Sequence, residues 1–204
     1  MIEYNGENYE FVGARKESYR LESRKPIVEN GTLEDDQNRR DFTINAISIK
    51  LNKKEYGLLI DPFRGIEDLK NKIIRTPLNP NKTYNDDPLR MMRAVRFATQ
   101  LNFEIDEKSY LAIKINAKRL SIVSQERITE ELNKIILSPN PSNGFKLLFK
   151  TQLLQQFFSE FAKLEGIETI GKHAHKDNFY HTIKVLDNIS KNTNNLWLRW
   201  AALL

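Results

Sequence analysis

The sequence contains no cysteine among its 204 residues, so disulfide bonds and thiolate metal sites are excluded. No run of apolar residues approaches the length that spans a membrane, and the N-terminus does not resemble a secretory signal peptide. Internal repeats and low-complexity segments are also absent from the sequence. We therefore expect a cytoplasmic protein with no membrane partner.

What is present is typical of a globular protein. Hydrophobic residues make up 40% of the chain and charged residues 29%, and the length is sufficient to bury one large core or two small ones. The net charge of +5 is a moderate excess of basic residues. Such an excess is compatible with a polyanionic partner, although it does not identify one.

The sequence pattern changes near residue 77. The earlier part favours short strands over 8–12, 56–60 and 73–75, a long polar loop over 13–31, and a helix that begins after Thr32. For 39–49 the periodicity is compatible with either a helix or a strand. The later part is helical almost throughout, with helices predicted over 87–101, 107–117, 124–137, 141–149, 151–165 and 178–190 and from about 195. The pattern predicts an α+β fold.

A polar cluster occupies residues 39–45. It contains Arg39, Arg40, Asp41 and Asn45 within seven positions. Paired guanidinium groups can bind a triphosphate, while Asp41 or Asn45 can contact a sugar hydroxyl. Without further context, an ordinary ion-pair cluster at the surface explains the same residues.

A second cluster begins the helix predicted over 87–101. Asp86 and Asp87 can cap it, and Pro88 suits its first turn. Three arginines follow at intervals of three residues, which predicts that Arg90, Arg93 and Arg96 form one cationic strip along the helix. The spacing also places Asp87 beside Arg90. That pair is either a local ion pair at a helix start or an acceptor and donor that grip a base.

Four strings in this order resemble the class II tRNA nucleotidyltransferase and bacterial poly(A) polymerase family. They are Arg-Arg-Asp-Phe-Thr-Ile-Asn-Ala at 39–46, Asp-Pro-x-x-Gly with Asp-Leu over 61–69, Asp-Asp-Pro-Leu-Arg-Met-Met-Arg-Ala-Val-Arg-Phe at 86–97, and Ser-x-Glu-Arg-Ile with Glu-Leu over 124–132. Taken by itself, the Asp-Pro-x-x-Gly string is more simply explained as a structural turn.

This resemblance implies addition of nucleotides to an RNA 3′ end without a nucleic-acid template. The partners would be tRNA and nucleoside triphosphates, and the substrates would be ATP and CTP. Residues 1–76 would be the C-terminal part of a nucleotidyltransferase head. Residues 77–140 would be a helical neck, and 141–204 a helical body with the start of an HD-type domain.

The resemblance also assigns roles to individual residues. Asp87 and Arg90 match the pair that reads the incoming base: a carboxylate accepts from the exocyclic amine of cytosine or adenine, and a guanidinium donates to the ring nitrogen. The implied nucleotide-binding residues are Arg39, Arg40, Asp41, Asn45, Asp87, Arg90, Arg93, Arg96 and Arg127. Basic side chains that can hold an RNA backbone are Lys114, Lys118 and Arg119.

Phosphoryl transfer of this kind uses carboxylates that hold Mg²⁺. In the family these form an Asp-x-Asp pair that follows a glycine-rich phosphate loop, and neither motif occurs in this sequence. We expect both to lie upstream of Met1, so that the chain is a fragment and is inactive alone. Glu10 stands where a third carboxylate is expected, although an exposed strand residue is an equal interpretation.

The three histidines lie within nine residues, at His173, His175 and His181. Phe179-Tyr180-His181-Thr182 resembles the first histidine motif of an HD-type phosphohydrolase, whose next ligands would follow Leu204. His181 alone is an incomplete metal site, so an active hydrolase is not expected. Three alternatives to CCA addition stay open: poly(A) synthesis, addition of AMP only, and RNA binding without catalysis.

Overall fold

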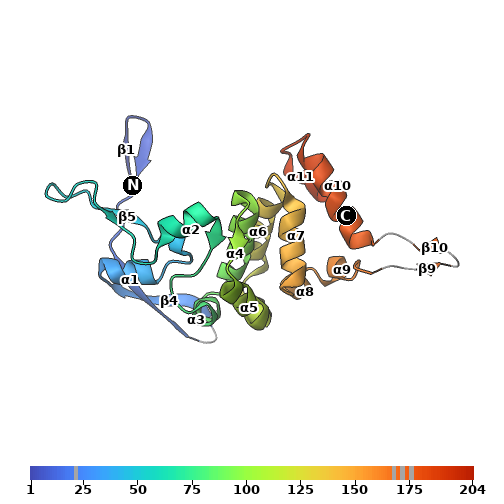
Figure 1. Cartoon of the computed structure of the whole chain (residues 1–204), viewed down its shortest axis with the longest axis horizontal. Helices are drawn as coiled ribbons and strands as arrows, with labels where there is room; N and C mark the ends of the chain where they lie inside the picture. The colour runs from blue at the N-terminus through green and yellow to red at the C-terminus, as the bar shows by residue number, and fades with distance from the viewer. Residues whose placement is uncertain (21–22, 167–168, 171–172, 175–176) are drawn as a thin grey trace.

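The computed structural model describes residues 1–20, 23–166, 169–170, 173–174 and 177–204. Figure 1 shows an elongated molecule in which the order of the chain follows the long axis. Short strands and small helices form the first part, and packed helices form most of the rest. The fold class is therefore α+β, as the change in sequence pattern predicts.

Two antiparallel hairpins begin the chain. Their strands are β1 (Ile2–Tyr4), β2 (Glu7–Tyr9), β3 (Arg15–Arg20) and β4 (Ser23–Asn30). Asn5 and Gly6 connect β1 to β2 and have positive φ angles of 52° and 79°. A two-residue turn with both φ angles positive matches the twist of a hairpin, and Asn-Gly is its most favourable sequence.

The hairpins correct two predictions. The strand expected over 8–12 ends at Tyr9, because the turn at Asn5 and Gly6 places its pairing partner earlier in the chain. The loop expected over 13–31 contains β3 and β4. These two strands are rich in charged residues and do not alternate between apolar and polar positions, so their periodicity does not reveal them.

Short elements follow the hairpins. They are α1 (Leu33–Asn38), η1 (Thr43–Asn45), β5 (Ser48–Ile49), β6 (Leu59–Ile60), α2 (Gly65–Asn71) and β7 (Ile73–Ile74). Thr32 caps α1 in a capping box with Asp35, as expected. The Asp61 carboxylate accepts hydrogen bonds from the backbone N–H groups of Gly65 and Ile66 at 2.7 and 2.9 Å. The Asp-Pro-x-x-Gly string therefore shapes the start of α2.

Buried polar contacts join these short elements. The hydroxyl of Thr43 donates to Asp68 at 2.7 Å, and Arg75 lies 3.2 Å from the same carboxylate. A Cβ on Gly65 would lie only 2.3 Å from the carbonyl oxygen of Thr43, so α2 packs directly on the η1 backbone. Residues 39–49, for which helix and strand were both open, form only the short η1 and β5.

Helices dominate the remainder of the chain. The elements are α3 (Pro80–Asp86), α4 (Leu89–Leu101), β8 (Glu104–Ile105), α5 (Glu107–Asn116), η2 (Ala117–Ile122), α6 (Gln125–Ile136), α7 (Pro141–Lys150), α8 (Leu154–Phe157), α9 (Ser159–Ala162), β9 (Thr169–Ile170), β10 (His173–Ala174), α10 (Asn178–Ser190) and α11 (Leu196–Ala201). The predicted bounds of α4, α5, α6, α7, α10 and α11 are confirmed to within two residues.

Three features of this part differ from the predictions. Asp86 is the last residue of the unforeseen helix α3, so it does not cap α4. β8 pairs with β7 in parallel, and this strand pair joins the helices to the first part of the chain. The helix predicted over 151–165 is replaced by the short α8 and α9, after a left-handed backbone conformation at Gln152.

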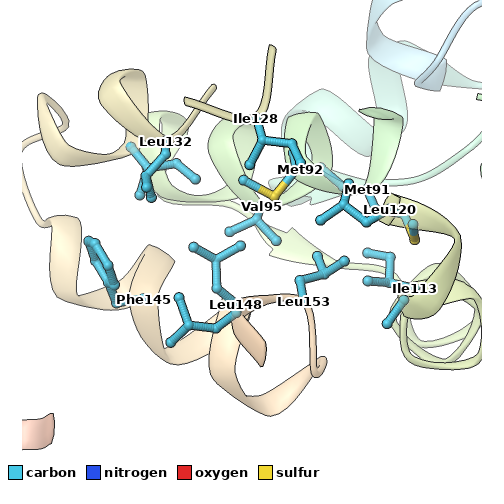
Figure 2. Close-up of a cluster of buried hydrophobic side chains, with 14 of the residues drawn as sticks. Met91, Met92, Val95, Ile113, Leu120, Ile128, Leu132, Phe145, Leu148 and Leu153 are labelled. Atoms are coloured by element: carbon cyan, nitrogen blue, oxygen red, sulfur yellow. The ribbon is translucent and has the colours of Figure 1, made fainter. Parts of the chain in front are cut away.

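The core lies where α4 packs against α6 and α7 (Figure 2). Met92 and Val95 of α4 and Phe145 and Leu148 of α7 are buried there. Phe42 extends this core into the first part of the chain. Its buried ring meets Phe97 edge-on, with the ring centroids 5.7 Å apart. Across the described residues, every helix is too short or too polar to cross a membrane.

Candidate functional site

Two arginines after α1 share one carboxylate. Arg39 and Arg40 both donate to Asp36, and the Nη1 atom of Arg39 also reaches Glu17 of β3 at 3.2 Å. Burial alone would raise the pKa of Asp36, but the hydrogen bonds from the two arginines outweigh it and hold that pKa below its ordinary value. The carboxylate therefore stays ionised and positions both guanidinium groups.

Asp41 connects the polar cluster to α4. One of its oxygens accepts from the backbone N–H of Phe42 and from the Asn45 amide, both at 3.0 Å. The other accepts from Nε of Arg93 at 2.7 Å. Because Asp41 is buried, these contacts orient Arg93 from one side. Asn45 acts here through Asp41 and does not line the cavity described below.

Asp87 and Arg90 lie side by side, as their spacing predicts. Asp87 directly follows α3 as its C-cap, and one of its carboxylate oxygens accepts from the backbone N–H of Leu89 at 3.2 Å. Nε of Arg90 lies 4.0 Å from the other oxygen, and Nη2 of Arg90 donates to the Arg39 carbonyl at 2.6 Å. The two side chains are only 16% and 11% exposed, so both are held in place before any ligand arrives.

These residues surround one cavity of about 340 Å³, which we call the arginine cavity. Its lining residues come from β3, β4, the end of α1, α4 and α6: Glu17, Tyr19, Pro26, Arg39, Arg40, Asp41, Asp87, Leu89, Arg90, Arg93 and Arg127. Five of them are arginines and three are carboxylates. A concave site with this balance favours an anionic ligand that also offers hydrogen-bond donors.

The sequence did not reveal the contribution of β3. Glu17 and Tyr19 are two positions apart, so their side chains lie on the same face of the strand. The Tyr19 hydroxyl donates to Glu17 at 2.7 Å, and burial together with that carboxylate raises the pKa of the phenol. Five of the six residues of β3 are polar or charged, so no apolar alternation in the sequence marks Glu17 and Tyr19 as site residues.

Several expected binding residues lie elsewhere. Arg96 forms an ion pair at 2.6 Å with the buried Glu131 and lies over the Phe97 ring at 4.0 Å, so it joins α4 to α6 rather than lining the cavity. Arg119 donates to the Asn85 carbonyl at 2.9 Å. The other expected basic residues on and after α5, both exposed, are Lys114 and Lys118.

The carboxylates that the structure describes do not gather into a Mg²⁺ site. Glu10 is exposed and follows β2 instead of lying within a strand, which corrects its expected position. In the part of the chain that the structure describes, no three His, Asp or Glu side chains gather closely enough to hold a metal ion.

Of the three histidines, His181 is exposed on α10. His175 and the side chain of His173 lie outside the described residues. The expected HD-type site at His181 therefore stays a prediction.

Two family models match the chain. The one described as "Poly A polymerase head domain" matches residues 1–75, and the one described as "Probable RNA and SrmB- binding site of polymerase A" matches residues 102–164. Together these segments cover well over half of the chain.

Proteins with similar sequences are tRNA nucleotidyltransferases. A CCA-adding enzyme of Lactobacillus helveticus is 45% identical over 154 residues, which are 74% of this chain and 37% of that protein. A mitochondrial CCA tRNA nucleotidyltransferase of Candida glabrata is 38% identical over 154 residues, or 73% of this chain and 28% of that protein. The chain thus spans less than two fifths of the length of these two relatives.

Solved structures resemble the fold. The CCA-adding enzyme of Bacillus stearothermophilus in complex with CTP has a TM-score of 0.63 and 39% identity, covering 67% of this chain and 34% of that one. A tRNA nucleotidyltransferase complexed with a primer tRNA and an incoming ATP analog has a TM-score of 0.65 and 28% identity. The match covers 91% of this chain and 52% of that one. The chain belongs to the family of class II tRNA nucleotidyltransferases, or CCA-adding enzymes, and bacterial poly(A) polymerases.

Proposed function

We propose that this chain supplies the nucleotide-selecting site of an enzyme that adds CMP and AMP to the 3′ ends of tRNA without a template. The observation that carries this proposal is the Asp87–Arg90 pair, held at 4.0 Å in the wall of the arginine cavity. A carboxylate and a guanidinium at this separation present an acceptor beside a donor. They can therefore read one edge of a base.

The chemistry of that edge explains the choice of nucleotides. Cytosine and adenine both offer an exocyclic amine next to an unprotonated ring nitrogen, so Asp87 accepts from the amine and Arg90 donates to the nitrogen. Uracil and guanine offer a carbonyl and a ring N–H at these positions. Each would place an acceptor against the Asp87 carboxylate and leave buried polar groups unpaired, which is costly.

The remaining arginines suit the phosphates. Arg39, Arg40 and Arg93 converge on the same cavity from two elements, and Arg127 reaches it from the start of α6. Planar guanidinium groups bind phosphate oxygens bidentately, so these side chains support binding of a nucleoside triphosphate. CTP and ATP are the substrates we assign to the site.

The names of similar proteins support this proposal, since relatives are described as CCA-adding enzymes and solved neighbours as complexes with CTP or with a primer tRNA and an ATP analog. We further propose a division into a head over 1–76, a neck over 77–140 and a body from 141. The reaction would take place in the cytoplasm and would require Mg²⁺.

The test measures incorporation of labelled CTP, ATP, UTP and GTP into tRNA that lacks its terminal CCA. In the enzyme, the Asp87→Ala/Arg90→Ala variant should lose its preference for CTP and ATP by about 5- to 150-fold, which corresponds to about 1–3 kcal/mol for a base contact. The control is Lys70→Ala on α2, because Lys70 is exposed and lies outside the cavity. An unchanged nucleotide preference would rule out base reading by this pair.

The same assay separates the alternatives. Incorporation of AMP alone, or of long AMP runs, would replace CCA addition by A-addition or poly(A) synthesis at the same site. Salt-sensitive tRNA binding with no incorporation by the enzyme would identify a non-catalytic RNA-binding module. Either result would contradict the proposed reaction.

A further inference from the structure

A second cavity lies near the opposite end of α4. Its volume is about 390 Å³, and none of its lining residues lines the arginine cavity. We call it the lysine cavity, after Lys146 and Lys150 of α7. Because an α-helix rises 1.5 Å per residue, Arg93 and Asn102 are separated by roughly 13 Å along α4. The two cavities are therefore separate sites on one helix.

One part of the lysine cavity is apolar and aromatic. Phe103 precedes β8, Tyr110 belongs to α5 and Leu147 to α7, and all three line the cavity while remaining partly exposed. Phe103 and Leu147 also pack against the buried core, so their positions are fixed by the fold. Rigid aromatic and aliphatic side chains of this kind form a surface on which the flat face of a nucleobase can stack.

The other part is cationic. Lys146 and Lys150 are four residues apart, which places them one above the other on the same face of α7. Within the described residues, neither forms an ion pair with a carboxylate. Glu104 also lines the cavity, so two positive charges stand against one negative charge. Two ammonium groups that are not neutralised by a neighbour favour a phosphate.

We propose that the lysine cavity binds one nucleoside monophosphate unit. The base would stack against Phe103 and Tyr110, and the phosphate would contact Lys146 and Lys150. The cavity volume lies in the range of small-molecule sites, about 300–1,000 Å³. Such a unit can come from a free nucleotide or from an unpaired residue of an RNA. This inference does not depend on the function proposed for the arginine cavity.

The experiment titrates the protein with AMP, with tetra-adenylate and with inorganic phosphate by calorimetry. Every variant compared carries Asp87→Ala/Arg90→Ala, which removes base reading at the arginine cavity and leaves the same phosphate contacts there in each titration, so that any difference between variants arises at the second site. In this background, Lys146→Glu/Lys150→Glu should weaken binding of AMP or tetra-adenylate at least about tenfold, since each reversal removes a charge-assisted contact. Lys184→Glu, an exposed lysine on α10, is the matched control.

A second variant tests the base. Asn143 is exposed, lines the cavity and belongs to α7, so Asn143→Phe should fill the aromatic part without removing either lysine or any core side chain. We expect this variant to lose AMP binding to a similar extent. Thermal unfolding of each variant confirms that the fold is intact.

The outcomes are distinct. Binding of AMP identifies a free nucleotide as a source, and binding of tetra-adenylate alone identifies unpaired RNA; both support the proposal. Equal competition by inorganic phosphate, or full binding in Asn143→Phe, would show that no base is read and would overturn it. Unchanged affinity in Lys146→Glu/Lys150→Glu would overturn it as well. Failure of nucleotide selection at Asp87 and Arg90 would leave these readouts unaffected.

Discussion

Arg199 illustrates how this protein buries a charged side chain against backbone carbonyls. It is 1% exposed. Its Nη1 atom donates to the carbonyls of Ile136 and Ser138 at 2.7 and 2.9 Å, and its Nη2 atom donates to that of Ser190 at 2.9 Å. One guanidinium group thereby satisfies backbone acceptors at the ends of α6 and α10 and holds α11 against them.

Replacing Arg199 should therefore destabilise the protein more than most single substitutions do. Arg199→Met leaves the three carbonyls buried without donors, and we expect a loss of about 3–5 kcal/mol in the free energy of unfolding. Arg199→Lys keeps the charge but not the planar fork, so it should recover only part of this loss. Denaturant unfolding of both variants measures the effect. Wild-type stability in Arg199→Lys would show that charge alone suffices.

Replacing Asp86 should stabilise the protein, in contrast to replacing Arg199. Burial raises the pKa of its carboxyl above the ordinary value despite Lys82, Arg90 and Arg119 nearby. It is also the last residue of α3, where the helix dipole disfavours a negative charge. The native state thus holds this proton more tightly than the unfolded state does. Ionisation of Asp86 therefore lowers stability as the pH rises through the raised pKa.

We expect Asp86→Asn to raise the unfolding midpoint at pH 7, because the variant has no carboxyl group whose ionisation the folded state disfavours. The difference should shrink as the pH falls below about 4, because the carboxyl is then protonated in both states. Thermal unfolding across this pH range provides the measurement. A stabilisation that is independent of pH would contradict the electrostatic cause.

Whether a helix or strand could be predicted depends on whether its apolar residues recur at a regular interval in the sequence. α4, α6 and α7 each bury one apolar stripe, so their sequences show it and their bounds were predictable. β3 and β4 lack such a stripe, and their pairing depends on backbone contacts that residue patterns do not encode. Since β3 contributes Glu17 and Tyr19, part of the arginine cavity could not be predicted either.

Close packing among these helices leads to a prediction at Gly144. A Cβ at this position would lie 2.5 Å from Cγ2 of Ile135 on α6 and 2.7 Å from Oγ1 of Thr99 on α4. Alanine favours a helix over glycine by about 1 kcal/mol, but overpacking a core costs about 1–3 kcal/mol. Because the two effects partly cancel, we expect Gly144→Ala to destabilise the protein by up to about 2 kcal/mol in net terms.

Denaturant titration checks this, with Asn143→Ala on the exposed side of the same helix as the control. The control should change stability by less than about 0.5 kcal/mol. If Gly144→Ala were stabilising, helix propensity would outweigh the contact, and α7 would be free to move away from α4.

For the molecule as a whole, the candidate site is the junction between the first part of the chain and the helices. Arg93 of α4 binds Asp41, and Arg90 of α4 donates to the Arg39 carbonyl. The motifs predicted Asp41, Asp87 and Arg90 as site residues, and all three line the arginine cavity, while their role in binding a nucleotide stays a prediction. Arg96 shows the limit: its spacing matches that of Arg93, but the buried Glu131 draws its guanidinium toward α6.

Because the arginine cavity spans this junction, a nucleotide bound there should stabilise the two parts of the chain together. A ligand that binds only the folded state adds about 2.7 kcal/mol at a concentration one hundred times its Kd. We therefore expect CTP and ATP to raise the unfolding temperature in one cooperative transition, and UTP and GTP to raise it less at the same concentration. Asp87→Ala/Arg90→Ala should make the four shifts equal, because phosphate contacts from Arg39, Arg40 and Arg93 remain while base reading is lost. Equal shifts in the wild-type protein would mean that the cavity recognises the phosphates alone, and nucleotide selection would then have to arise outside the Asp87–Arg90 pair.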